Sequence, residues 1–481
     1  MKMINRNGFN IKKISLYLIV GYVCLAIAFY YLVGYQLHFR QSRGNIEMPI
    51  AESGTVELTQ GALVEQKFSA KIQRLQSISI RWGIYNRINS GTVTVELYDL
   101  RNNDLLMQQN IDAAKIKESE ITTMSVNNPI ETVYDAPLLL RIYSDSVGGQ
   151  AVSPLMSSVE QSDEFTLTIN GTPVEGMLCF SASGEDYIWT GLHYWEFVVG
   201  FGLAMSIYLA FTYYKWKKGR SSLLINAVAA VQKYRFLIKQ LVSRDFKAKY
   251  KRSILGVFWS FLNPLLTMVV QYLVFSNLFR FDIPYYPVYL LSGIIVFNYF
   301  SEACGMALTS IVGNAALITK VYVPKYIYPL TRVLSSLINL LISMIPLIIV
   351  TMFSGLYPTK VYFLLPFVLL CTATFCLGLG MLLASAMVFF RDIQFLWGVL
   401  SMIWMYFTPI FYPESILPEQ VAGILKINPL YYFITFVRTC VIEGVSPEPI
   451  MYVQCFLMAA ISLFVGALVF KKTQDKFVLY L

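Results

Sequence analysis

The stretch that decides the fold is RDFKAKYKRSILGVFWSFLNPLL, residues 244–266. Its first nine residues hold five cations, and the remainder is apolar and aromatic apart from Ser253, Ser260 and Asn263. A group of Lys and Arg directly before a long apolar segment is typical of a chain that enters a membrane from the cytoplasm. The stretch therefore predicts a membrane span, and it raises the question of whether its cations also bind an anion.

Composition places the whole chain among integral membrane proteins. The 481 residues are 56% hydrophobic and 15% aromatic, only 14% are charged, and the mean hydropathy is +0.55. Soluble domains usually carry about 25% charged residues. A soluble enzyme or binding module of this length is therefore excluded, and the number of spans becomes the first question.

Charge is distributed unevenly along the chain. Residues 45–190 contain 19 Asp or Glu and 9 Lys or Arg, a balance of −10, within a chain whose net charge is +9. The rest of the chain therefore has a balance of +19. This asymmetry indicates an acidic water-facing domain and a membrane body whose cations face the cytoplasm.

The first part of the chain is predicted to be a span, a water-facing domain and a second span. The apolar run at 14–35 lies within residues 1–44, and the preceding Lys and Arg predict a cytoplasmic N-terminus. A signal peptide is the alternative, but the run is too long for one and no small-x-small cleavage site follows. A second apolar run, 195–214, lies within the span predicted at 191–220, and KWKKGR follows it.

Residues 45–190 are predicted to form an extracytoplasmic all-β domain, a sandwich or jelly roll. Short runs with β-branched and aromatic residues, such as GTVTVELYDL, alternate with turn residues. Cys179 is the one cysteine in this domain, so an internal disulfide is excluded. His38 and His193 lie far apart, so neither a metal site nor a histidine-based catalytic triad is predicted.

The remaining chain is predicted to be an α-helical polytopic body. Residues 221–253 read as an amphipathic helix along the cytoplasmic interface, and residues 254–481 as a six-span core. These spans are expected near 254–278, 286–308, 331–353, 361–388, 394–412 and 451–470, which makes about eight in the whole chain. The five prolines and two short apolar pieces of 413–450 predict a re-entrant hairpin on the outer side, and the C-terminus is expected in the cytoplasm.

Residues 230–481 resemble the permease subunits of type-2 ABC exporters that move lipid-linked polysaccharides such as O-antigen and teichoic acid. Several motifs carry the resemblance, in the order of the family: RDFKAKYKRSILGVFWSFLNPLL at 244–266, NAALITKVYVPKYIYPL at 314–330, FFRDIQ at 389–394, MYFTPIFYPESILP at 405–418 and INPLYYFITFVR at 427–438. The N-terminal unit, residues 1–220, departs from the usual permease. What the resemblance implies about transport therefore does not explain the β-domain.

The basic run has two interpretations. A polysaccharide built on a polyprenyl lipid carries a phosphate or pyrophosphate at headgroup depth, where Lys and Arg can bind it. The predicted pyrophosphate gate consists of Arg244, Lys247, Lys249, Lys251 and Arg252. The alternative is that the run only obeys the positive-inside rule and attracts anionic lipid.

Aromatic residues and one acid are further candidates within the spans. Sugars stack on aromatic rings, so a channel lining is predicted, although rings also form interfacial belts and cores. The lining candidates are Trp259, Phe261, Tyr272, Phe297, Tyr299, Phe300, Tyr406, Phe407, Tyr431 and Tyr432. Glu302 is an intramembrane acid with a functional role. The alternatives are a hydrogen bond to a neighbouring helix and a position nearer the membrane surface. The Asn263-Pro264 pair either kinks the channel wall or is a tolerated proline.

No G-x-x-x-x-G-K-[ST] phosphate loop occurs in the chain, so no cofactor is expected on it. The resemblance implies a homodimer with two copies of a separate ATPase subunit, which would bind ATP and Mg. It also implies that the interface helix and the loop at 314–326 contact that ATPase, unless the loop is an ordinary connection. The coupling candidates are Asn314, Leu317, Ile318, Lys320, Tyr322 and Pro324.

The β-domain is a candidate glycan-binding module. Trp82, Tyr85, Tyr98 and Tyr134 could stack on sugars, although the same rings could form a core. The alternatives are a structural cap, dimer contacts or docking of a wall-assembly enzyme.

The expected function is that of a non-enzymatic permease for a polyprenyl-pyrophosphate-linked wall polysaccharide in a bacterial plasma membrane. Its partners would be membrane lipids, the lipid-linked glycan, the ATPase and a second copy, with no nucleic acid. Export of small amphiphilic drugs or lipids is the alternative within transport. A membrane glycosyltransferase, for which the chain lacks a D-x-D metal motif, and an outer-domain sensor are alternatives of other classes.

Overall fold

The computed structural model describes residues 11–42, 44, 46, 48–118, 120–131, 134–158, 165–218, 223–251, 253–278, 283–320, 323–418, 420, 423 and 425–480. The chain forms two compact units. One consists of Met1–Gly34 with Glu196–Leu481, and the other consists of Tyr35–Trp195. We refer to them as the membrane unit and the β-unit.

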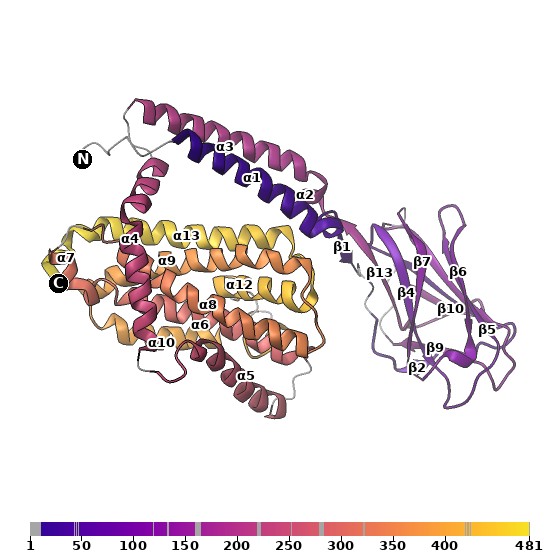
Figure 1. Cartoon of the computed structure of the whole chain (residues 1–481). Helices are drawn as coiled ribbons and strands as arrows, with labels where there is room; N and C mark the ends of the chain where they lie inside the picture. Colours follow the sequence, from indigo (N-terminus) through magenta and orange to yellow (C-terminus); the bar gives the residue numbers. More distant parts are fainter. Residues whose placement is uncertain are drawn as a thin grey trace. The chain divides into compact units, whose positions relative to one another are not determined.

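The β-unit consists of two antiparallel sheets (Figure 1). In the described part of the chain, the seven-stranded sheet has the order β1-β13-β4-β9-β12, with β2 on β9 and β7 on β4. Its strands are β1 (Phe39–Ser42), β2 (Ser53–Gly54), β4 (Arg74–Gly83), β7 (Ile121–Ile130), β9 (Ser153–Ser157), β12 (Met177–Leu178) and β13 (Phe180–Tyr187). The six-stranded sheet has the order β11-β10-β3-β8-β5-β6. Its strands are β3 (Leu63–Ser69), β5 (Thr92–Asp99), β6 (Asp104–Asp112), β8 (Pro137–Ser144), β10 (Thr166–Ile169) and β11 (Thr172–Val174).

Buried and partly exposed side chains alternate along the strands, and the buried ones form the core between the two sheets. In β8, PLLLRIYS, the side chains of Leu138, Leu140 and Ile142 are fully buried, while their neighbours are partly exposed. Successive strand residues point to opposite faces, so this period of two places one side in the core. Phe68 of β3 and Phe180 of β13 meet across the core with ring centres 5.0 Å apart. The predicted β-sandwich is confirmed.

The membrane unit is helical. Seven helices among the described residues are long and apolar enough to cross a membrane. They are α1 (Ile11–Val33), α3 (Tyr194–Lys217), α5 (Phe258–Leu278), α6 (Tyr286–Leu308), α8 (Ile327–Phe353), α9 (Leu365–Phe389) and α13 (Pro449–Thr473). The chain is therefore a multi-pass membrane protein. Shorter elements are η2 (Gly34–Leu37), η3 (Ala113–Lys115), α2 (Trp189–Leu192), η4 (Val312–Asn314), α7 (Ala315–Lys320), η5 (Lys360–Leu364), η6 (Glu414–Ile416), η8 (Gln474–Lys476) and α14 (Phe477–Tyr480).

The helix expected at 394–412 is shorter than predicted. It is α10 (Ile393–Tyr406), with 14 residues, which span about 21 Å at 1.5 Å per residue. A hydrocarbon core is about 30 Å thick. The helix ends before Pro409, because a proline disfavours helical conformation at the residue before it and cannot donate a ladder bond itself.

Close helix packing forms the centre of the membrane unit. Helix α6 is buried along most of its length, and it packs against α8 and α9. Helices α9 and α13 lie side by side in Figure 1. A Cβ at Gly466 of α13 would lie 1.9 Å from the carbonyl oxygen of Gly378 of α9. The two glycines therefore permit a backbone approach that a larger residue would block.

Helix α4 (Leu223–Tyr250) runs across the long helices rather than parallel to them (Figure 1). It packs against α8, with Leu241 buried. A helix is thus present at Leu223–Tyr250, within the range 221–253 that was predicted for it. Its crossing direction is the one expected for a helix that lies along a membrane surface.

The segment predicted as a re-entrant hairpin contains short helical pieces. Helix α12 (Pro429–Arg438) begins at Asn428, whose side chain accepts a hydrogen bond from the backbone N–H of Leu430. A π-helical turn, η7 (Thr439–Glu443), follows and ends at Gly444. Helix α12 packs against α6, α9 and α13 and is largely buried, so protein surrounds it.

Candidate functional site

The last turns of α4 present two different faces. Arg244, Lys247 and Lys251 follow the spacing i, i+3, i+7, whereas Leu241, Asp245 and Lys249 follow i, i+4, i+8. Residues at these spacings lie on one helix face. Leu241 and Asp245 are buried, so the second face packs against the helix bundle. Helical geometry therefore divides the predicted gate into two sets.

The first face lines an open pocket of about 720 Å³ at the junction of α4 and α5. Its lining residues are Arg244, Phe246, Lys247, Ala248, Tyr250, Lys251, Gly256 and Val257. Gly256, with φ of 51°, provides the left-handed turn between the two helices. We call this hollow the cationic pocket, because three cations surround an apolar and aromatic wall. Such a lining is suited to an anion that is joined to an apolar group.

Arg244 is fixed at one edge of the cationic pocket. Its Nε donates to Oδ1 of Asp245 at 3.0 Å, and its Nη2 donates to Oδ1 of Asn314 at 3.3 Å. Arg332 of α8 also pairs with Asp245, at 3.3 Å. These contacts tie the end of α4 to the segment at Asn314 and to α8. By contrast, Lys247 and Lys251 have no carboxylate within ion-pair distance in the described ranges and are exposed.

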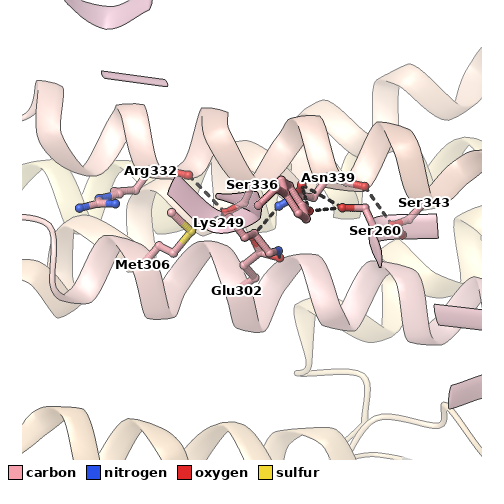
Figure 2. A network of polar contacts seen from close by, with 9 residues as sticks. Lys249, Ser260, Glu302, Met306, Arg332, Ser336, Asn339 and Ser343 are labelled. Atoms are coloured by element: carbon pink, nitrogen blue, oxygen red, sulfur yellow. Dashed lines mark hydrogen bonds and ion pairs between the residues drawn. The ribbon is translucent and has the colours of Figure 1, made fainter. Parts of the chain in front are cut away.

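The second face places Lys249 in a polar network with residues of α6 and α8. Figure 2 shows Lys249 and Asn339 converging on Glu302 of α6. Lys249 Nζ lies 2.8 Å from Glu302 Oε2, and Asn339 Nδ2 of α8 donates to Glu302 Oε1 at 2.7 Å. Lys249 therefore does not line the cationic pocket. Glu302 makes a hydrogen bond to the neighbouring helix α8, which was one of the predicted alternatives.

Tyr250 connects the network to the cationic pocket. Its ring lines the pocket, while its hydroxyl donates to Asn339 Oδ1 at 2.8 Å and is hydrogen-bonded to Ser260 of α5. Ser343 of α8 donates to the carbonyl of Ser260 at 3.0 Å. Helices α4, α5, α6 and α8 thus meet through one set of side chains, the Glu302 network, which consists of Lys249, Tyr250, Ser260, Glu302, Asn339 and Ser343 (Figure 2).

Sequence reasoning did not identify Asp245, Asn339 or Tyr250 as site residues. Asp245 is the one acid within the basic run, and Asn339 is an isolated amide within an apolar span. Both are signals that single-sequence reading could use, since polar groups inside a membrane helix usually have partners. Arg252 of the predicted gate lies outside the described residues.

The aromatic candidates separate into core and surface residues. Four lining predictions are wrong, because these rings are buried by neighbouring helices: Phe297, Tyr299, Phe300 and Tyr432. Phe300, for example, packs against Trp404 with ring centres 5.0 Å apart. Helix α6 is buried along most of its length, so the rings on it face neighbouring helices.

The remaining rings lie at or near the surface of the membrane unit. More than a third of each of the following side chains is exposed: Trp259, Tyr272, Tyr406 and Phe407. Phe261 and Tyr431 are half-buried, and the Tyr431 hydroxyl donates to Glu414 at 2.7 Å. Helix α5 continues through Pro264, so the proline does not end the helix. These exposed rings stay predictions as lining residues.

The coupling candidates lie next to α4. Leu317 and Ile318 of α7 pack against a cluster of buried residues that includes Leu241 of α4 and Phe477 of α14. Asn314 donates to the carbonyl of Ser310 at 2.7 Å and accepts from Arg244. Lys320 ends α7 and Pro324 lies in the connection to α8, while Tyr322 lies outside the described residues. The two segments predicted to contact an ATPase are therefore neighbours in the fold, together with the C-terminal segment.

A buried arginine was missed by sequence reasoning. The guanidinium of Arg438 donates to the carbonyls of Pro409, Ile410 and Tyr289 at 2.7, 3.1 and 3.2 Å. It joins the irregular turn after α10 to α6 and α12. Its position at the end of an amphipathic 10-residue segment gave no signal of this contact.

The β-unit places the predicted stacking residues differently. Trp82 is fully buried in the core, so its interpretation as a glycan contact is wrong. Tyr85 and Tyr134 are exposed, and Tyr98 is half-buried on the outer face of the six-stranded sheet. Trp82 belongs to the core because it lies on the same face of β4 as Ile78 and Ile80, which are also buried.

The outer face of the six-stranded sheet carries a row of polar side chains. Strand register aligns Glu65, Arg141, Glu96 and Gln108 across four strands. The hydroxyls of Tyr98 and Tyr143 donate to Glu96 at 3.0 and 2.9 Å. Hydrogen bonding to this carboxylate raises the pKa of both tyrosines. We call this surface the Glu96 row, and it contains one of the predicted rings, Tyr98.

Comparisons with known proteins match the helical half of the chain. Residues 236–442 match the family described as ABC-2 type transporter. The chain is 32% identical to the O-antigen export system permease protein RfbA of Myxococcus xanthus over 258 residues, which are 53% of this chain and 98% of the relative. It is 29% identical to an O-antigen export system permease protein RfbA of Klebsiella pneumoniae, covering 50% of this chain and 93% of the relative. It is also 21% identical to the polysialic acid transport protein KpsM of Escherichia coli, with the same coverage.

Proposed function

Because this chain belongs to the ABC-2 type transporter family, whose membrane subunits are permeases and not enzymes, we propose that it exports a polyprenyl-pyrophosphate-linked cell-surface polysaccharide. The polymer is an O-antigen, a teichoic acid or a related wall glycan. Relatives from three organisms carry names of O-antigen or polysialic acid transport, which supports a polysaccharide substrate. The proposed location is a bacterial plasma membrane, with both termini in the cytoplasm and the β-unit outside.

The cationic pocket is the observation that carries the lipid-linked part of this proposal. Arg244, Lys247 and Lys251 surround a wall that contains Phe246 and Val257. A pyrophosphate could bind the cations while the attached polyprenyl chain stays beside apolar surface. A small neutral amphiphile would not use the three charges.

The family implies a partner ATPase subunit. We propose that two copies of it bind ATP and Mg and contact α4 and α7, whose side chains meet in one apolar cluster. We also propose a homodimer of the permease. The outward faces of α5 and α10 carry many exposed apolar side chains, such as Val270 and Phe395, which a second copy would cover.

The β-unit is proposed to bind the glycan as it leaves the membrane. The Glu96 row supplies hydroxyl, carboxylate and guanidinium groups beside two tyrosine rings. Sugar hydroxyls could pair with these polar groups, and the rings would contact C–H faces. This surface replaces Trp82 in the proposed site.

The test is ATPase activity of the full chain, purified with its ATPase partner in lipid, with and without undecaprenyl-pyrophosphate-linked glycan. We expect the glycan lipid to stimulate ATP hydrolysis, and the variant Arg244→Ala/Lys247→Ala/Lys251→Ala to lose that stimulation. The matched control is Lys215→Ala/Lys217→Ala/Lys218→Ala, which removes three cations near the end of α3. Stimulation by small uncharged amphiphiles alone would contradict the proposal, as would equal stimulation of all three proteins.

A further inference from the structure

We propose that Glu302 competes with an anionic lipid head group for Lys249. The lysine pairs with Glu302 until a head group binds at the cationic pocket, and it then pairs with the head group. The inference deepens the proposed function and rests on it. The ligand class is a polyprenyl pyrophosphate. Lys249 is then a fourth cationic ligand of the head group, available only after its ion pair with Glu302 has opened.

Lys249 lies close to the cationic pocket because of its position along α4, but it does not line the pocket. Ala248 and Tyr250, its neighbours on both sides, line the pocket, and Lys247 and Lys251 provide two of the pocket's cations. The Lys249 ammonium lies 5.7 Å from the centre of the Tyr250 ring. A long, flexible lysine side chain at this point has two anion sites within its range: Glu302, and an anion in the pocket.

Partial exposure makes the ion pair exchangeable. The side chains of Lys249 and Glu302 are 42% and 27% exposed, so protein encloses neither group. A partly exposed ion pair at the cytoplasmic interface proposed for α4 contributes little net stability, because the charges are partly screened and the side chains lose freedom. A fully buried pair could not open in this way, since the remaining charge would be left without solvent.

The rest of the Glu302 network keeps the acid in place after the lysine leaves. Asn339 donates to Glu302 Oε1 at 2.7 Å, independently of Lys249, which contacts Oε2. Asn339 is in turn held by the Tyr250 hydroxyl at 2.8 Å. The carboxylate therefore retains one hydrogen bond while Lys249 is bound elsewhere.

Competition has a measurable consequence for binding. When a ligand needs a group that is occupied for part of the time, the apparent affinity falls in proportion to the free fraction. Removing the Glu302 charge should therefore tighten binding of a polyprenyl pyrophosphate. The gain should require Lys249, because the released lysine is its cause.

The experiment measures binding of farnesyl pyrophosphate to the full chain in phosphatidylcholine nanodiscs. Four variants are compared with the wild type: Glu302→Gln, Lys249→Met, the double variant Glu302→Gln/Lys249→Met, and Asp392→Asn. Asp392→Asn is the control for loss of one negative charge, because Asp392 is exposed in the turn before α10. We expect Glu302→Gln to bind about two- to sixfold more tightly, as for the opening of a partly exposed ion pair. Asp392→Asn should bind like the wild type, and the double variant should bind no better than Lys249→Met.

A second variant keeps the test valid if Glu302→Gln does not fold. Glu302→Asp keeps the charge but shortens the side chain, so the 2.8 Å contact with Lys249 is lost and a smaller gain is expected. An unchanged or weaker affinity in the Glu302 variants, or a gain that persists without Lys249, would overturn the competitor role. Inorganic pyrophosphate and farnesol, tested separately, distinguish the head group from the lipid chain as the source of binding.

The outcomes separate this inference from the proposed function. One outcome refutes only the competition: the wild type binds, removal of Arg244, Lys247 and Lys251 abolishes binding, and Glu302→Gln binds no more tightly than the wild type. Absence of binding to every variant contradicts both the competition and the proposed head-group pocket.

Discussion

The guanidinium carbon of Arg438 lies 3.4 Å from the centre of the Tyr289 ring, and these two residues hold the turn after α10 against α6. Arg438 is 8% exposed. Its two terminal nitrogens donate to three backbone carbonyls, two of which belong to residues 409 and 410. An irregular turn within protein needs such donors, because its carbonyls have no helical partners.

We expect Arg438→Lys to destabilise the membrane unit by about 2–4 kcal/mol, because a lysine cannot reproduce the planar fork or its stacking on Tyr289. The measurement is the thermal unfolding midpoint of the purified chain in detergent. Arg391→Lys, at an exposed position in the turn before α10, is the control and should leave the midpoint unchanged. Equal midpoints for wild type and Arg438→Lys would show that the fork geometry is not needed.

Gly466→Ala should destabilise the contact between α9 and α13. The new Cβ would lie 1.9 Å from the carbonyl oxygen of Gly378, so the helices must separate, at a cost of about 1–3 kcal/mol. Gly21→Ala in α1 is the control, since nothing lies within 4 Å of a Cβ there. A lower unfolding midpoint is expected for the first variant alone. A midpoint raised in both would indicate that helix propensity outweighs the close contact.

Trp82→Ala should destabilise the β-unit by about 3–5 kcal/mol, because it removes a fully buried ring and leaves a cavity. Tyr134→Ala, at a side chain that is 56% exposed, should have little effect on stability. Limited proteolysis of the full chain would report opening of the β-unit. Similar cleavage rates in both variants would argue against the assignment of Trp82 to the core.

The β-unit should lose stability in acid partly through Asp99. Hydrogen bonds from the Arg101 guanidinium lower the pKa of the Asp99 carboxyl. A carboxylate whose folded pKa is depressed stabilises the fold above its unfolded pKa, about 3.9, and this contribution is lost as pH falls through the folded value. Asp99→Asn should therefore unfold more easily at pH 7, and the difference from wild type should shrink below about pH 4.

Intrinsic fluorescence of the full chain between pH 7 and pH 3 would measure this change. Asp104→Asn, an exposed position on the next strand, is the control and should keep the pH dependence of the wild type. A difference between wild type and Asp99→Asn that stays constant over the whole pH range would contradict the role of Asp99.

Local pattern predicted the elements of this protein well. The period of two in PLLLRIYS predicted a strand of a sandwich, and two long apolar runs predicted α1 and α3, which come before and after the β-strands in the sequence. The shortened α10 was harder to predict, because its apolar run extends past the helix end and only Pro409 marks the change. These features depend on neighbours in the sequence, which is why a single sequence contains them.

The sequence by itself determined that the chain is a membrane protein with a sandwich between two spans, because burial of apolar side chains imposes a period that can be read locally. The sequence also shows that five cations lie close together along the chain, within residues 244–252. Only the tertiary structure decided that Lys249 pairs with Glu302 while Arg244, Lys247 and Lys251 line a pocket. It likewise decided that Trp82 and Phe300 are core residues. The physical reason is that partners such as Glu302 and Asn339 lie far along the chain, so their contacts depend on how helices pack rather than on local period.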